Sequence, residues 1–129
     1  MESQTANQSA AIDWARIRML HELQEEGAPD LIQQLVELFE EGTATRLAGA
    51  HKALRDGDFK SLRREAHSLK GSAGVIGADA LRDAAARLER EAEGENRGAA
   101  SAALGAVEAE AATARIELSS GAKEQSRER

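Results

Sequence analysis

The chain has 129 residues, 41% of them hydrophobic, which is enough apolar material for one domain but too little chain for a multidomain enzyme. Its 17 basic and 23 acidic side chains leave a formal net charge of −6, which disfavours a general nucleic-acid binder because the phosphate backbone must be neutralised by Lys and Arg. There is no cysteine, so a disulfide framework and a thiol nucleophile are both excluded. Alanine occurs 27 times against three aromatic residues and one proline, so we expect an all-α protein.

The N-terminal region combines a polar segment with a short amphipathic one. Residues 1–11 are small and polar and are expected to form a disordered tail. They contain no basic region followed by an apolar run, and no later stretch approaches the roughly 18 apolar residues of a membrane span, so a cytoplasmic protein is expected. Asp13 can cap a short helix that ends at Gly27 and Pro29. Its apolar residues recur at helical spacing, at Trp14, Ile17, Leu20 and Leu23.

A long helix and a shorter one follow, separated by a turn. Asp30 is a candidate N-cap for a helix of about 24 residues, or roughly 36 Å. Its expected inward stripe is Leu31, Leu35, Leu38, Phe39, Leu47, Ala50 and Leu54. The run 55–58 predicts a turn, and Asp58 can cap a helix that ends near Gly77. The inward stripe of this next helix is Leu62, Ala66, Leu69, Ala73 and Ile76.

Two more helices complete the prediction. Asp79 opens one of them, and the glycine-containing loop 94–98 ends it. Its apolar positions are Leu81, Ala84, Leu88 and Ala92, and those of the last helix are Ala103, Leu104, Val107, Ala111, Ala114 and Leu118. We therefore predict an antiparallel four-helix bundle over 12–118 with a short extra N-terminal helix, followed by a polar C-terminal tail over 119–129. A monomer is the default expectation.

His67 stands apart from the core stripe of its helix. On a helical wheel that places Leu62 at zero, His67 falls near 140°, so its side chain is expected to point away from the core. The segment between residues 59 and 77 contains four basic side chains and one acidic side chain, Glu65. Its formal local charge is therefore +3, which favours binding of an anion. The four basic residues are Lys60, Arg63, Arg64 and Lys70.

Two glycines follow His67 on its own face. Gly71 and Gly74 each cost a helix roughly 1 kcal/mol relative to alanine, but they leave room for another protein to approach the imidazole. Neutral imidazole is a good nucleophile near neutral pH and can take a phosphoryl group reversibly. Lys70 is within helical reach to pair with the added negative charge.

The segment 67–74, His-Ser-Leu-Lys-Gly-Ser-Ala-Gly, followed by Val-Ile-Gly, resembles the signature of the histidine-containing phosphotransfer (HPt) domain family. The resemblance extends over about residues 12–118. It implies that His67 is phosphorylated on its outer ring nitrogen, that Lys70 assists electrostatically, and that Gly71 gives access to a receiver domain. Glu89 stands where related domains place a polar partner for the inner ring nitrogen, often Gln, and we predict that it fixes the tautomer of His67.

The prediction is therefore a phosphocarrier, not an enzyme, that moves phosphoryl groups between the aspartates of response-regulator receiver domains, or from a histidine kinase. There is no GxxxxGK[ST] loop for ATP, so the phosphoryl group must come from another protein. No cofactor is expected in this chain, and the Mg²⁺ should belong to the partner receiver. Lys60, Arg63 and Arg64 are expected to attract that partner, although they could equally be an ordinary solvated face.

Two alternatives remain open. The first is a helical adaptor that binds receivers through the same face without being phosphorylated, and the second, ranked last, is a transferase or phosphatase for small molecules. His21 and His51 lack flanking glycines and a matching motif, so they are interpreted as surface residues. No metal site is expected, because no Glu-x-x-His pair is present.

Overall fold

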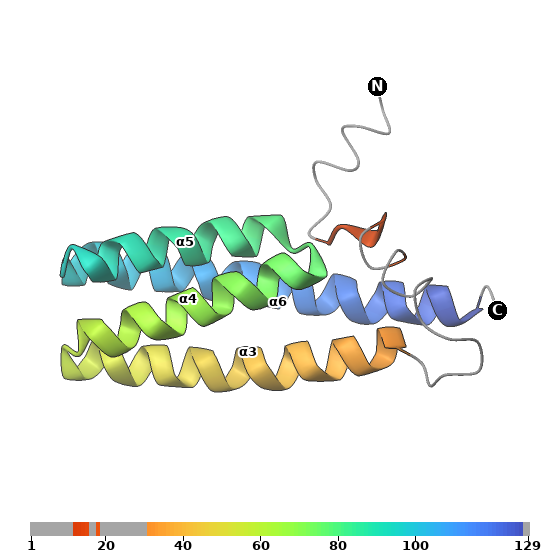
Figure 1. The fold of residues 1–129 in the computed structure, drawn as a ribbon, viewed down its shortest axis with the longest axis horizontal. Coiled ribbons are helices and arrows are strands. Elements are labelled where there is room, and N and C mark those ends of the chain that lie inside the picture. The colour runs from red at the N-terminus through yellow and green to blue at the C-terminus, as the bar shows by residue number, and fades with distance from the viewer. Residues whose placement is uncertain (1–11, 16–17, 19–30, 128–129) are drawn as a thin grey trace, which may run out of the picture.

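The computed structural model describes residues 12–15, 18 and 31–127. Four helices form the described part of the molecule: α3 (Leu31–Asp56), α4 (Phe59–Ile76), α5 (Asp79–Glu93) and α6 (Arg97–Arg127). Each packs against two neighbours, in the order α3, α4, α5, α6 and back to α3, so they form a closed four-helix bundle with short connections (Figure 1). This confirms the predicted all-α bundle.

Local capping explains the sharp turn before α4 and the one after it. The Asp58 side chain accepts a hydrogen bond from the Ser61 backbone N–H at 3.1 Å and another from the Ser61 hydroxyl at 2.6 Å. These hydrogen bonds, led by that from the Ser61 side chain, lower the pKa of Asp58. At the other end Gly77 adopts the left-handed conformation, with φ +74°, and its N–H returns to the last turn of α4. Both residues therefore end α4 where the sequence predicts.

The core includes the predicted stripes of α4 and α6, most of the α5 stripe and one face of α3. The largest fully buried side chains are Leu62, Leu69, Leu81, Leu88, Leu104, Val107 and Leu118. Alanines fill the positions between them, and their small size lets the helices approach closely. On α5 the fully buried alanine is Ala85, whereas Ala84 is only partly buried.

The long helix α3 is rotated relative to its predicted inward face. The buried positions are Ile32, Val36, Phe39, Thr43, Ala50 and Ala53, and Leu38 is 67% exposed. Leu38 lies about 120° from Ile32 around the helix, so it cannot join the same stripe. Its predicted core position is therefore wrong, because α3 carries apolar residues on more than one face and only its packing against α4 and α6 decides which face is buried.

The structure describes the C-terminal end of α6 and part of the region before α3. Helix α6 continues beyond Leu118 to Arg127, and Ser119 donates a hydrogen bond to Glu40 of α3 at 3.2 Å. At the other end Trp14, Ala15 and Arg18 are helical, and the backbone N–H of Asp13 donates to the carbonyl of Gly77 at 2.9 Å. The tail over 1–11, the rest of the predicted first helix and His21 lie outside the described residues.

The packing of the core makes one prediction about stability. Replacing the fully buried Leu62 with Ala should lower the free energy of unfolding by about 2–5 kcal/mol, because the removed methyl groups leave a cavity among helices that cannot collapse fully. Urea unfolding followed by circular dichroism measures the loss. Leu38→Ala is the matched control and should change the free energy of unfolding by less than about 0.5 kcal/mol. A larger effect at Leu38 than at Leu62 would contradict the assigned core.

Candidate functional site

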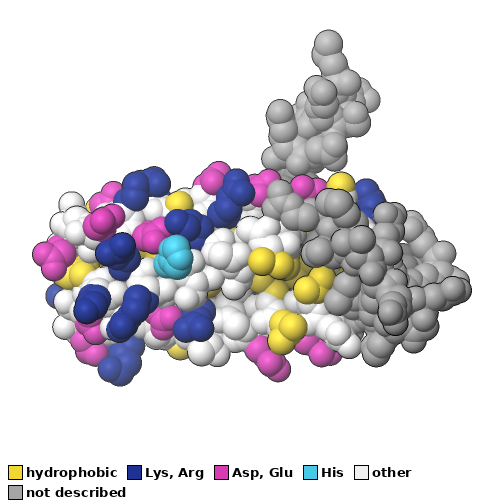
Figure 2. Space-filling view, in the orientation of Figure 1, with side chains coloured by type: hydrophobic (Ala, Val, Ile, Leu, Met, Phe, Trp, Pro, Cys, Tyr) yellow, Lys and Arg dark blue, Asp and Glu magenta, His cyan; other side chains and the backbone are white. Residues whose placement is uncertain are grey.

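His67 lies on the outer face of α4, between the buried Ala66 and Leu69 stripe positions, and its side chain is 69% exposed. Figure 2 shows one face of the molecule, where Lys and Arg side chains gather around a histidine on one half and hydrophobic side chains gather on the other half. Within the described part of the chain, only Glu89 contacts the ring of His67 through a hydrogen bond. The imidazole is therefore accessible to another molecule.

Glu89 reaches His67 from the neighbouring helix α5. Its Oε2 lies 2.9 Å from Nδ1 of His67, and its side chain is only 17% exposed. An ionised carboxylate can only accept hydrogen bonds, so Nδ1 must carry the proton that joins the two groups. In the neutral ring the lone pair then resides on Nε2, which is the nitrogen that faces away from Glu89.

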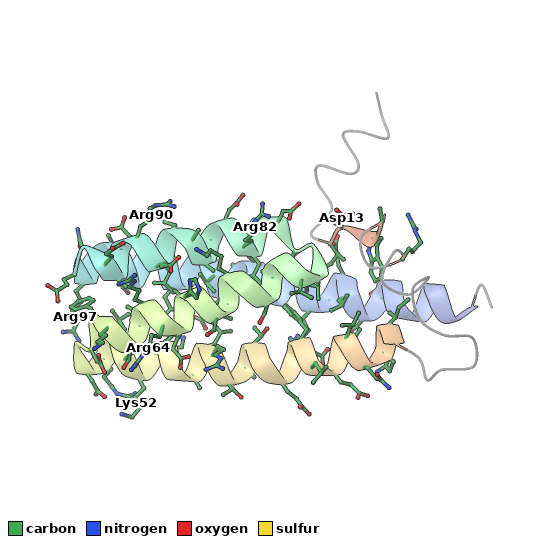
Figure 3. All side chains as sticks on the ribbon, viewed as in Figure 1. Asp13, Lys52, Arg64, Arg82, Arg90 and Arg97 are labelled. Atoms are coloured by element: carbon green, nitrogen blue, oxygen red, sulfur yellow. The ribbon has the colours of Figure 1, made fainter. Side chains whose placement is uncertain are left out.

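Lys70 contacts the same carboxylate. Its Nζ donates to Oε1 of Glu89 at 2.6 Å, so the two oxygens of Glu89 bind two different side chains of α4 (Figure 3 shows the sticks along these helices). The hydrogen bond from Lys70 is the main cause that lowers the pKa of Glu89, burial opposes it, and the hydrogen bond from His67 lowers it further. Any stabilisation from this cluster is therefore present above the pKa of Glu89 in the unfolded chain and is lost as the pH falls through its lowered value.

The two glycines after His67 differ in their surroundings. A Cβ added at Gly71 would meet no atom within 4 Å, whereas one at Gly74 would lie 3.9 Å from Cδ of Arg82 on α5. In Figure 3, Arg64 lies on α4 nearer the α3–α4 turn, and Arg82 lies on α5 nearer the α4–α5 turn. The open surface beside the imidazole is thus at Gly71, and Gly74 is partly covered.

The predicted basic residues stay on the surface. Lys60, Arg63 and Arg64, called the basic patch below, are all exposed, and none of them forms an ion pair with a described carboxylate. Among the described residues, the one side-chain hydrogen bond that Arg64 donates is to the Ser61 hydroxyl, at 3.0 Å. Their charge is therefore available to a partner.

An apolar groove lies on the other side of His67 along α4, between α3 and α4. It has a volume of about 200 Å³ and is lined by Leu35, Leu38, Phe39, Ser72, Val75 and Ile76. Leu38 and Val75, which both line this groove, are each more than half exposed, so its apolar wall is open to solvent. This groove is not predictable from the hydrophobic pattern, which places Leu38 in the core.

The ion pair between Lys70 and Glu89 was likewise not predicted from the sequence. The only available signal was that Glu89 directly follows the core residue Leu88, which places its side chain at the edge of the packed face of α5. His51 contrasts with His67, because its Nε2 lies 3.0 Å from Oε1 of Glu108 and so is already engaged. Within the described residues no group of three His, Asp or Glu side chains could hold a metal ion. None of the described helices has an apolar stretch long enough to cross a lipid bilayer.

Comparison with known proteins identifies the family. The Hpt domain model matches residues 34–115, so the chain belongs to the Hpt domain family, whose members are phosphotransfer proteins of phosphorelays. No curated protein matches the chain by sequence at a significant level.

Solved structures support the same assignment. Histidine-containing phosphotransfer protein B (HptB) from Pseudomonas aeruginosa PAO1 is 31% identical, with a TM-score of 0.74 over 90% of this chain and 97% of that one. Two plant proteins show the same fold at lower identity. ZmHP2 from maize is 23% identical with a TM-score of 0.80, covering 95% of this chain and 92% of its own. MtHPt2 from Medicago truncatula is 20% identical with a TM-score of 0.81, covering 98% and 88%.

Proposed function

We propose that Nε2 of His67 accepts a phosphoryl group from the aspartyl phosphate of a receiver domain, or from a histidine kinase, and passes it to the aspartate of another receiver. The observation that carries this proposal is that the His67 side chain is 69% exposed while its Nδ1 lies 2.9 Å from Oε2 of Glu89. Membership of the Hpt family supports phosphotransfer in general, and the engagement of His51 Nε2 by Glu108 favours His67 as the proposed acceptor.

The bonds broken and formed in this phosphoryl transfer involve no group of this chain other than the imidazole of His67. In the accepting step the P–O bond of the aspartyl phosphate breaks, the Nε2–P bond forms, and the partner's carboxylate leaves. Because Nδ1 keeps its proton, the neutral ring becomes an imidazolium as the new bond forms. The negative charge of Glu89 at 2.9 Å stabilises this cation, and the reverse step returns the ring to neutrality. The Mg²⁺ that such transfers use is supplied by the receiver.

The surface around His67 supports docking of a whole protein domain. A standard interface covers roughly 800 Å² on each partner, or a disc of about 16 Å radius. Val75 lies about 12 Å along α4 from His67 in one direction, and Lys60 about 10 Å in the other. A receiver centred on His67 therefore covers the apolar groove and the basic patch together, with the imidazole between them.

The apolar groove yields a prediction about this docking. Leu38→Asp should weaken receiver binding about tenfold or more, because a charge enters an apolar contact within the interface. Ile116→Asp is the matched control, since Ile116 is comparably exposed on α6 and is not part of the groove. Titration calorimetry measures both affinities. Equal affinities for the two variants would remove the groove from the interface.

Glu89 is proposed to be a positioning residue that holds the Nδ1–H tautomer. Glu89→Ala should slow phosphoryl acceptance by about 10- to 100-fold, the loss typical of a side chain that orients a reactive histidine. The ¹⁵N chemical shifts of the His67 ring report directly which nitrogen carries the proton, and a purely structural role would leave them unchanged. Glu108→Ala, which removes the partner of His51, is the control and should not change the tautomer of His67. An unaltered His67 tautomer in Glu89→Ala would contradict the proposed role.

One experiment tests the function as a whole. The protein is incubated with a phosphorylated receiver, and the chain is examined for phosphate that is labile in acid and stable in base. A carrier acquires this label and loses it to a second, unphosphorylated receiver. A helical adaptor would bind the receiver without acquiring label, and that result would overturn the proposal.

A further inference from the structure

One carboxylate in this site binds two donors of different kinds. Oε1 of Glu89 accepts from the ammonium group of Lys70 at 2.6 Å, and Oε2 lies 2.9 Å from Nδ1 of His67. The sequence assigns the positive charge of Lys70 to the incoming phosphoryl group, but in the unphosphorylated protein that charge is already paired with Glu89. The two assignments describe the same lysine in two states of the site.

The charges of the three groups differ between those states. In the form that attacks, which needs a neutral imidazole, Glu89 is negative and Lys70 is positive, so the three groups together have no net charge. After transfer, the ring is an imidazolium and Nε2 carries a phosphoryl group with about two negative charges at neutral pH. Glu89 then faces two cations, while the phosphoryl group has none bound to it within this cluster.

We propose that Lys70 changes partner when His67 is phosphorylated, leaving Glu89 for the phosphoryl oxygens while Glu89 retains Nδ1 of His67. The inference rests on the proposed function, because it requires phosphorylation at Nε2. The exchange converts a three-group cluster into two pairs of opposite charge, Glu89 with the imidazolium and Lys70 with the phosphoryl group. Each pair joins groups that carry their full charges.

The surroundings make Lys70 the group that moves. Its side chain is flexible and 34% exposed, and it leaves α4 one turn after His67 on the same face. Glu89 is 17% exposed and follows Leu88, which is fully buried in the core, so its carboxylate has little freedom. When the phosphoryl group departs, the ammonium group returns to Glu89 and is not left unpaired.

The test follows the ¹⁵Nζ resonance of Lys70 in the wild type and in Glu89→Gln, each before and after phosphorylation. Potassium phosphoramidate serves as the phosphoryl donor, so no partner protein is needed, and ³¹P spectra confirm the modification of His67. The variant His67→Gln controls for labelling of other histidines. Lys52, which pairs with Asp56 at 3.1 Å within α3, is the internal reference lysine.

The expected result is a difference in response between the two states. Glu89→Gln should shift the Lys70 resonance in the unphosphorylated protein and leave it nearly unchanged in the phosphorylated protein, where Lys70 no longer contacts residue 89. Lys52 should respond to neither change. If Glu89→Gln shifts Lys70 equally in both states, the lysine stays on Glu89 and the inference is overturned.

The failure of this inference can be told apart from failure of the proposed function. Lys70 could change partner after chemical phosphorylation while no receiver phosphorylates the protein. That result would retain the inference and overturn the proposed relay function. Transfer between receivers with no change at Lys70 would do the reverse. If phosphoramidate places no phosphoryl group on His67, its Nε2 is not an accessible nucleophile and both fail.

Discussion

Replacing His67 with Gln should abolish acid-labile labelling of the chain by a phosphorylated receiver, whereas His51→Gln should leave the labelling intact. The His67 side chain is largely exposed and its Nδ1 is engaged by Glu89, so glutamine removes the proposed nucleophile Nε2 while keeping a polar side chain of similar reach. His51 has its Nε2 engaged by Glu108 on the α3–α6 side of the bundle and lies outside the proposed site. Labelling is measured by ³²P transfer followed by parallel acid and base treatment.

The control for this prediction is a check that both variants remain folded. Both histidines are exposed, so neither variant should change the free energy of unfolding by more than about 0.5 kcal/mol. A loss of label in His67→Gln that accompanied unfolding would say nothing about chemistry, and circular dichroism excludes it. Persistent label in a folded His67→Gln protein would show that another residue is the acceptor.

Gly71→Gln should raise the stability of the protein and at the same time suppress phosphoryl transfer. Glycine inside a helix costs roughly 0.5–1 kcal/mol, and a Cβ at this position meets nothing within 4 Å, so the folded protein gains from the substitution. The new side chain nevertheless occupies the open surface one turn from His67. A displacement of the approaching receiver by about 1 Å can reduce the transfer rate by about 100-fold.

Gly105→Gln is the matched control for this substitution. Gly105 is also an exposed helical glycine, on α6, with no atom within 4 Å of an added Cβ. It should give the same gain in the free energy of unfolding with no change in the transfer rate. Urea unfolding and single-turnover transfer from a receiver measure the two quantities. Equal transfer rates in the two variants would show that Gly71 provides no clearance for the partner.

The agreement between sequence and structure is closest on α4. Its buried residues, its N-cap Asp58 and its C-terminal Gly77 all lie where the sequence predicts. The reason is that α4 carries a single apolar stripe with strong signals at both ends, so periodicity alone defines the inward face. The outward direction of His67 follows from the same periodicity. Local sequence therefore determines the accessible nucleophile and the glycine surface beside it.

Contacts between helices are less predictable from periodicity. On α3, several leucines lie outside the buried stripe, so the hydrophobic pattern admitted more than one inward face and Leu38 was misplaced. The apolar groove beside His67 exists only because α3 packs with Ile32 and Val36 inward and leaves Leu38 next to Val75 of α4. The rotation of one helix against another is decided by the sum of its packing contacts.

The four bundle helices, the capped ends of α4 and the outward direction of His67 follow from local sequence, because each depends on residues within a few turns of one another. The contact of Glu89 on α5 with both His67 and Lys70 on α4 depends instead on how the two helices pack. That arrangement depends on the rotation and axial offset of α5 against α4, where a shift of one residue would turn the Glu89 side chain by about 100°. The hydrophobic periodicity of either helix does not predict that offset, because it arises from how the buried faces of α4 and α5 pack together.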